Sequence, residues 1–227
     1  MRYDLLVLDL DGTLLDSFAG IHNAVNALLR TLDLEALPAD DVRACIGRGV
    51  RHLLRCALEH AGAVDTDPAA LLGTYAALYE RHGLEHTIPY PGVTNTLRAL
   101  QARGCRLAVL SNKPEDASLR LLRHLGMDAL FERVAGGDSF TEMKPSPLPL
   151  LTMIADLGVE TSRTLMVGDS VYDIECARAA GVDACAVSYG FQPVEMLKAL
   201  DPEYLVSAFD MIRDIVEGTI DRGQSKM

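Results

Sequence analysis

Tryptophan is absent from this 227-residue chain, and aromatic residues make up only 5% of it. No apolar run reaches the roughly 18 residues of a membrane-spanning helix, and no basic tract is present. Acidic residues outnumber basic residues by 32 to 21, which gives a formal net charge of −11. A surface this acidic repels a phosphate backbone overall. We therefore expect neither a nucleic-acid-binding protein nor a membrane protein.

Cysteine and lysine are also scarce. The five cysteines are scattered and contain no C-x-x-C pair, a pattern typical of reduced thiols and not of a disulfide framework or a zinc site. Acidic residues interrupt the first apolar run and no small-residue cleavage site follows it, unlike a signal peptide. Both features predict a cytoplasmic protein. Only four lysines stand beside 17 arginines, so a lysine that precedes a rigid Pro-x-Pro turn is less expected as an incidental surface residue.

Apolar residues make up 49% of the chain, enough for a buried core. Near-continuous apolar runs predict buried strands, and helix-like stretches that end in glycine precede the later ones. The alternation predicts an α/β fold with a doubly wound, mainly parallel, Rossmann-like sheet. The strands are expected over residues 3–10, 106–110, 163–167 and 184–187, and the helices over 94–103, 115–125, 148–156 and 171–180.

Residues 18–87 break this rhythm, because they contain no convincing strand. They predict consecutive helices over residues 20–31, 39–46, 50–61 and 68–82. We therefore expect two domains: an α/β core formed by residues 1–17 and 88–227, and an all-helical insertion over residues 18–87. The two short crossings between them can serve as hinges.

Polar residues collect where the predicted strands end, and ligands bind at that edge of such sheets. Asp9 and Asp11 close the first strand two residues apart, so both carboxylates can face one site. Ser111 and Asn112 close the second, where a hydroxyl and backbone N–H groups can hold a phosphate. The ordinary alternatives are a polar turn at Gly12 and a helix N-cap.

Two further segments complete the pattern. Lys144 precedes a Pro-x-Pro turn, and its ammonium suits a phosphoryl oxygen. Asp169 and Asp173 follow the third strand one helical turn apart and can face the same site. The alternatives are a solvated loop lysine and acidic residues that favour a helix N-terminus.

Taken together, these motifs resemble those of the haloacid dehalogenase superfamily of phosphohydrolases. The matching segments are DLDGTLLDS at residues 9–17, LSN at 110–112, Lys144 with its prolines, and GDSVYD at 168–173. The resemblance covers essentially the whole chain. It implies that the helical insertion is a C1-type cap domain and that the chain is a phosphoric monoester hydrolase.

The resemblance also implies a role for each matching residue. Asp9 is the nucleophile that becomes an aspartyl-phosphate, and Asp11 is the general acid and base. Mg²⁺ is the cofactor. Its ligands are Asp9, the backbone carbonyl of Asp11 and Asp169, while Gly168, Ser170 and Asp173 support the site. Thr13, Ser111, Asn112 and Lys144 bind the phosphoryl oxygens.

Two features separate branches of the superfamily. Asp11 favours phosphoryl transfer, because a halide leaving group needs no proton. The insertion has no lysine, which disfavours the phosphonate-cleaving branch with its Schiff-base lysine. Within the superfamily the chain is most similar to bacterial phosphoglycolate phosphatases, through YPGV at residues 90–93, SNKP at 111–114, KPSPLPL at 144–150 and SYGF at 188–191.

The substrate implied is therefore a small phosphorylated metabolite, with 2-phosphoglycolate the best single candidate, handled by a monomer or a homodimer. Arg48 in the insertion is a candidate partner for a substrate carboxylate, and a solvated arginine at a helix start is the alternative. The rival functions are a sugar phosphomutase resembling β-phosphoglucomutase, a pyrophosphatase, and a non-enzymatic phospho-ligand binder.

Overall fold

The computed structural model describes residues 1–221. The chain divides into two compact units, which we call the α/β unit (Met1–Leu15 with Pro89–Met227) and the helical unit (Asp16–Ile88). Within the described residues no helix combines the length and the apolar character needed to cross a bilayer.

The α/β unit is built on a six-stranded sheet whose described strands all run parallel to their neighbours. The strand order is β5-β4-β1-β6-β7-β8, so β1 lies in the middle. Leu5 of β1 lies opposite Arg106 of β4 and Thr164 of β6. The strands are β1 (Leu5–Leu8), β4 (Arg106–Leu110), β5 (Arg133–Ala135), β6 (Thr164–Gly168), β7 (Asp183–Val187) and β8 (Tyr204–Val206).

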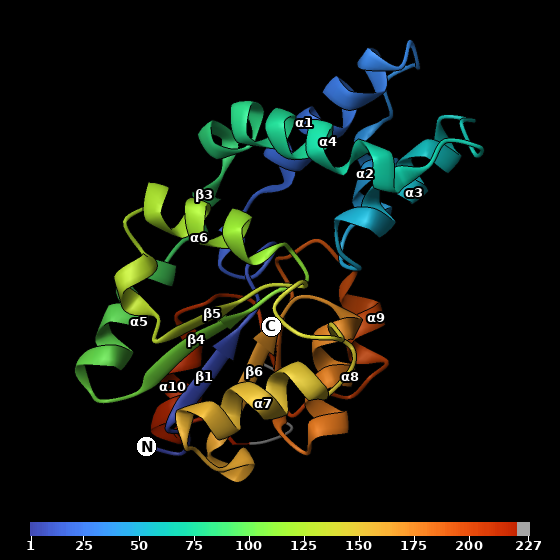
Figure 1. Ribbon diagram of the computed structural model, residues 1–227. Coiled ribbons are helices and arrows are strands. Elements are labelled where there is room, and N and C mark those ends of the chain that lie inside the picture. Colours follow the sequence, from blue (N-terminus) through green and yellow to red (C-terminus); the bar gives the residue numbers. More distant parts are fainter. Residues whose placement is uncertain (222–227) are drawn as a thin grey trace. The chain divides into compact units, whose positions relative to one another are not determined.

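Helices cover both faces of this sheet (Figure 1). They are α5 (Val93–Ala102), α6 (Glu115–His124), α7 (Leu148–Leu157), α8 (Val171–Ala180), α9 (Val194–Lys198) and α10 (Met211–Glu217), with short 3₁₀ segments at Asp128–Leu130 and Thr161–Arg163. Leu5 and Val7 of β1 share a buried core with Met153 of α7 and Ile174 of α8. All four residues of β1 are buried, so both faces of the strand are covered, which explains why it is apolar throughout.

The predicted α/β fold with a mainly parallel sheet is confirmed. The first strand, Leu5–Leu8, is shorter than the predicted range 3–10, although the Asp9 N–H still donates to Val167 O at the end of the strand. Two strands of the six-stranded sheet were not predicted: β5 and β8 have only three residues each, too few to show a hydrophobic period.

The helical unit consists of α1 (Phe18–Thr31), α2 (Ala39–Ala44), α3 (Val50–His60) and α4 (Pro68–His82), followed by a 3₁₀ turn at Leu84–His86. Asn26 fixes the α1–α2 connection, since its side chain accepts a hydrogen bond from Leu37 N–H (2.8 Å) and donates one to Leu37 O (3.1 Å). Gly20 lies so near Gly83 that a Cβ would come within 2.7 Å of the Gly83 carbonyl oxygen. Two short strands, β2 (Leu15–Asp16) and β3 (Ile88–Pro89), pair as a separate sheet.

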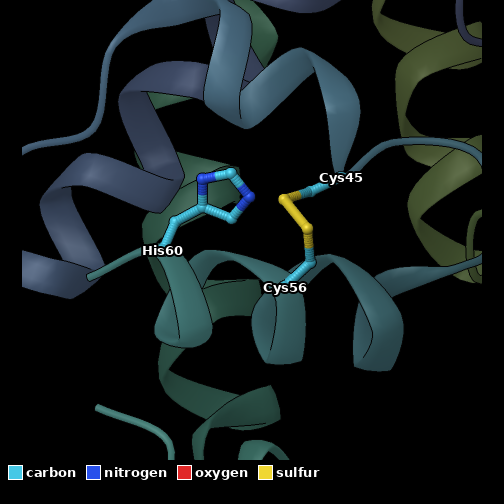
Figure 2. Close-up of side chains that lie close together, drawn as sticks. All are labelled: Cys45, Cys56 and His60. Carbon is cyan, nitrogen blue, oxygen red and sulfur yellow. A yellow bond between two sulfur atoms is a disulfide. The ribbon is translucent and has the colours of Figure 1, made fainter. Parts of the chain in front are cut away.

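The expectation that all five cysteines are reduced thiols is wrong for two of them. Cys45 and Cys56 form a disulfide within the helical unit, with their Cα atoms 5.5 Å apart (Figure 2). Cys105, Cys176 and Cys185 are free and buried in the α/β unit. The pairing escaped sequence analysis because the packing of α2 beside α3 brings the two residues together, whereas their spacing of 11 matches no motif.

Candidate active site

Lys144 is the centre of the polar cluster at the carboxyl edge of the sheet. Its residue is only 3% exposed, and its Nζ lies 2.9 Å from Asp9 Oδ1 and 2.6 Å from Asp173 Oδ1. The same Nζ donates a hydrogen bond to the carbonyl oxygen of Leu110, at 2.7 Å. Asp9 is held by the sheet, because its N–H donates to Val167 O at 2.9 Å. One ammonium therefore joins the ends of β1 and β4 to the first turn of α8.

Asp169 follows β6 and is positioned by two hydrogen bonds. Its Oδ2 accepts the Phe191 N–H at 2.7 Å, and its Oδ1 accepts the Thr13 hydroxyl at 3.2 Å. The backbone approaches this carboxylate closely at two positions, Gly12 and Gly190. A Cβ added at Gly12 or Gly190 would come within 2.3 or 2.2 Å of its atoms, so both positions require glycine. Thr13, expected to bind phosphate, thus places its hydroxyl on Asp169.

Asp173 is the third residue of α8 and completes a capping box with Ser170. Its Oδ2 accepts hydrogen bonds from the Ser170 N–H (3.0 Å) and hydroxyl (2.6 Å), while its Oδ1 meets Lys144. A Cβ at Gly168 would lie 2.1 Å from the Asp173 carboxyl carbon. Both carboxylate oxygens are therefore engaged, which fits the supporting role predicted for Asp173.

Asp9, Asp169 and Asp173 offer carboxylate oxygens that all lie within 4.8 Å of one another. Burial raises the pKa of Asp9 to about 6, with repulsion from Asp173 adding to the rise and Lys144 opposing it. Burial, then repulsion from Asp9 and Asp173, raises the pKa of Asp169 well above its usual range. Burial alone would lower the pKa of Lys144, but the two adjacent carboxylates outweigh it and raise that pKa. The cluster thus holds more negative charge than one lysine balances.

The segment after β4 supports the same edge. Ser111 continues the sheet, since its N–H donates to Ala135 O at 3.0 Å. The Asn112 side chain binds the backbone of Lys144 twice: it accepts the Lys144 N–H at 3.0 Å and donates to the Lys144 carbonyl at 2.9 Å. Asn112 therefore anchors the loop that presents Lys144. The phosphate-binding roles of Thr13, Ser111, Asn112 and Lys144 stay predictions.

Lys113 belongs to the site and was missed by sequence analysis. Its Nζ lies 3.1 Å from Asp11 Oδ2 and 3.4 Å from Asp11 Oδ1, and both side chains are largely buried. The available signal was its rarity, because Lys113 is one of only four lysines. Tyr189, within the SYGF segment, donates its hydroxyl to Thr13 O at 2.9 Å and was also missed.

Arg48 is exposed and lies in the helical unit, in the connection between α2 and α3. Its predicted contact with a substrate carboxylate stays a prediction.

Comparisons with known proteins agree with the fold and the motifs. The family model of haloacid dehalogenase-like hydrolases matches residues 6–187. A phosphoglycolate phosphatase of Rhodospirillum rubrum is 40% identical over 203 residues, covering 86% of this chain and 84% of that protein. One of Psychrobacter arcticus is 33% identical over 225 residues and covers 96% of both chains. The crystal structure of a predicted phosphoglycolate phosphatase from Haemophilus somnus superposes with a TM-score of 0.89 at 29% identity, covering 97% of this chain and 99% of that one. The chain therefore belongs to the haloacid dehalogenase-like hydrolase family.

Proposed function

We propose that this hydrolase is a Mg²⁺-dependent phosphatase that cleaves a small phosphomonoester through an aspartyl-phosphate at Asp9. The observation that carries the proposal is the position of Asp9 at the end of β1, 2.9 Å from the buried Lys144 and within 4.8 Å of the Asp169 and Asp173 carboxylates. The proposed nucleophile, a buried ammonium and further carboxylates thus lie close together at one edge of the sheet.

The carboxylates fit a divalent cation. Three buried acidic side chains lie together and only two of them, Asp9 and Asp173, pair with the Lys144 ammonium. Asp9 Oδ1 accepts no hydrogen bond of normal geometry within the described residues, although Lys144 lies close to it. All donors are oxygens, which suits Mg²⁺ better than a soft metal. Asp9 and Asp169, with the Asp11 carbonyl, would hold the ion, and Asp173 would support them through Lys144. When bound, Mg²⁺ would offset the repulsion between a phosphate dianion and the carboxylates.

The chain's own residues then divide the reaction into two displacements. A carboxylate oxygen of Asp9 bonds to phosphorus, the ester P–O bond breaks, and the leaving alkoxide takes a proton from Asp11. Water then attacks the same phosphorus, gives its proton to Asp11 and releases Asp9 with inorganic phosphate. Lys144 neutralises phosphoryl charge in both steps. Lys113, 3.1 Å from Asp11, positions the acid–base group.

We extend the proposal to 2-phosphoglycolate as substrate and to the cytoplasm as location. The names of the relatives at 33–40% identity support that substrate. The helical unit would serve as the cap, and Arg48 would meet the substrate carboxylate. A small anionic substrate is compatible with the acidic composition of the chain, because the lysines of the site can bind it locally without an extended basic surface. A structural neighbour described as a β-phosphoglucomutase is 20% identical and shares the fold alone.

The test is phosphate release from 2-phosphoglycolate, pyrophosphate, sugar phosphates and nucleoside monophosphates, each with Mg²⁺ and with EDTA. The proposal predicts Mg²⁺-dependent release with a strong preference for 2-phosphoglycolate. Broad, weak release would support the phosphatase chemistry but exclude 2-phosphoglycolate as the preferred substrate. Absence of release, together with bisphosphate-dependent isomerisation of a hexose phosphate, would replace the phosphatase with a mutase.

A further inference from the structure

A second cluster of metal-ligating side chains lies in the helical unit, away from the carboxylates. Cys45 ends α2, and Cys56 and His60 lie one turn apart on α3. The two sulfurs and a ring nitrogen of His60 all lie within 4.8 Å of one another. Figure 2 shows the imidazole beside the disulfide, with one ring nitrogen on the side that faces the sulfurs.

The cluster is built from two pairs of residues, each spaced one helical turn apart. Asp41 and Cys45 form the pair at α2, where Cys45 Sγ lies 3.2 Å from the Asp41 carbonyl oxygen. Cys56 and His60 form the pair on α3. The pairs meet, because His60 Nδ1 lies 3.8 Å from Asp41 Oδ2. The imidazole thus has a carboxylate 3.8 Å from one nitrogen, beyond hydrogen-bond distance, and the sulfurs on its other side.

We propose that the helical unit carries a redox-gated site for one thiophilic divalent cation, with Zn²⁺ as the type, held by the Cys45 and Cys56 thiolates and the His60 imidazole. The disulfide is the closed, metal-free form. Two thiolates and one imidazole are preferred zinc ligands, and water or Asp41 can supply a fourth. The cation would therefore be soft-ligated, unlike the oxygen-ligated ion of the α/β unit.

The chemistry balances with a small thiol as reductant. Two thiol molecules give two electrons and two protons to the Cys45–Cys56 bond, which becomes two thiols, while the reductant becomes its own disulfide. The cation then displaces the two thiol protons. In reverse, a low-molecular-weight disulfide accepts the two electrons, the protein S–S bond re-forms and the cation leaves. A reducing compartment would therefore hold the cation-binding form.

A disulfide that merely fastened α2 to α3 would need no third donor. His60 supplies that donor, and its side chain is 39% exposed, so a cation can reach it. The three free cysteines provide the contrast within the described residues. Cys105, Cys176 and Cys185 are buried in the α/β unit, and none of them belongs to a group of three potential ligands.

The test uses the full-length chain, reduced with a phosphine and kept in excess Mg²⁺ so that the carboxylate site is occupied. Co²⁺ is added, because only sulfur ligation gives thiolate-to-cobalt charge-transfer absorption. Competition with Zn²⁺ and a chromophoric chelator then gives affinity and stoichiometry. The variants are Cys56→Ser and His60→Gln, and Cys105→Ser is the matched control. Phosphatase activity plays no part in this readout, so it can fail independently of the proposed function.

The proposal predicts one sulfur-ligated Co²⁺ per reduced chain, none in the oxidised chain, loss in Cys56→Ser and weakening of about tenfold or more in His60→Gln. Cys105→Ser should behave as the unmodified protein does. His60 is exposed enough for its substitution to leave folding intact, which circular dichroism would verify. Absence of the charge-transfer band in the reduced chain, or its persistence in Cys56→Ser, would overturn the proposal. Equal Co²⁺ binding before and after reduction would do the same.

Discussion

Replacing Asp169 with asparagine should stabilise the metal-free protein while removing its response to Mg²⁺. The change keeps the side-chain shape, so the amide oxygen can still accept the Phe191 N–H and the Thr13 hydroxyl can turn to accept from the amide. What it removes is a buried negative charge near Asp9 and Asp173. The substitution therefore separates electrostatics from packing.

The size of the effect follows from the spacing of the carboxylates. The carboxylate oxygens lie within 4.8 Å of one another, and two unit charges at that upper limit repel by about 3.5 kcal/mol at an effective dielectric constant of 20. Asp169 has two such neighbours, whereas Lys144 and partial protonation offset part of the repulsion. We expect a net gain of about 1–3 kcal/mol in the free energy of unfolding, or roughly 2–10 °C in melting temperature.

The assay is thermal unfolding in EDTA and in saturating Mg²⁺. The unmodified chain should gain stability with Mg²⁺, by about 2.7 kcal/mol at 100 times the dissociation constant, and Asp169→Asn should gain little. The matched control is Asp156→Asn on the exposed side of α7, which should stay within about 0.5 kcal/mol of the unmodified chain. A lower melting temperature for Asp169→Asn in EDTA, or an undiminished Mg²⁺ response, would refute the reasoning.

Three further predictions address other residues. Lys113→Met should lower kcat about tenfold or more for an alkyl phosphate, but less for p-nitrophenyl phosphate, whose leaving group needs no proton. Equal losses for the two substrates would exclude a role of Lys113 in positioning Asp11. Gly190→Ala should lower the affinity for Mg²⁺ by about tenfold or more, because its Cβ would come within 2.2 Å of Asp169. An unchanged Mg²⁺ titration would contradict this expectation. Arg48→Ala should raise KM for a carboxylated substrate more than for p-nitrophenyl phosphate, and equal changes would exclude a carboxylate contact.

The centre of the sheet and its polar edge could be predicted because each buried strand appears in the sequence as a run of consecutive apolar residues. The runs that form β1, β4 and β6 are apolar at every or nearly every position, and the first polar residues after them are Asp9, Ser111 and Asp169. Parallel strands place these ends at one edge, so the convergence follows from topology. The peripheral strand β8 is too short to show such a run.

Contacts between distant segments could not be predicted from local patterns. Lys113 and Asp11 are separated by 102 residues, and the intervening sequence carries no sign of their ion pair. Asn112 fits a helix cap equally well until its side chain is seen on the Lys144 backbone. The Cys45–Cys56 disulfide likewise depends on how α2 packs beside α3. Such pairings are products of tertiary structure.

The central claim, covalent transfer to Asp9, is tested most directly by trapping the phosphoenzyme. Asp11→Asn should still accept phosphate from p-nitrophenyl phosphate, since that leaving group needs no acid, but should hydrolyse the intermediate slowly. Borohydride reduction of the quenched enzyme would convert an aspartyl-phosphate into homoserine, which mass spectrometry locates in the peptide. The account predicts homoserine at residue 9 only after substrate and Mg²⁺ are added. Turnover with residue 9 unmodified, or phosphate found on Ser111, would contradict it.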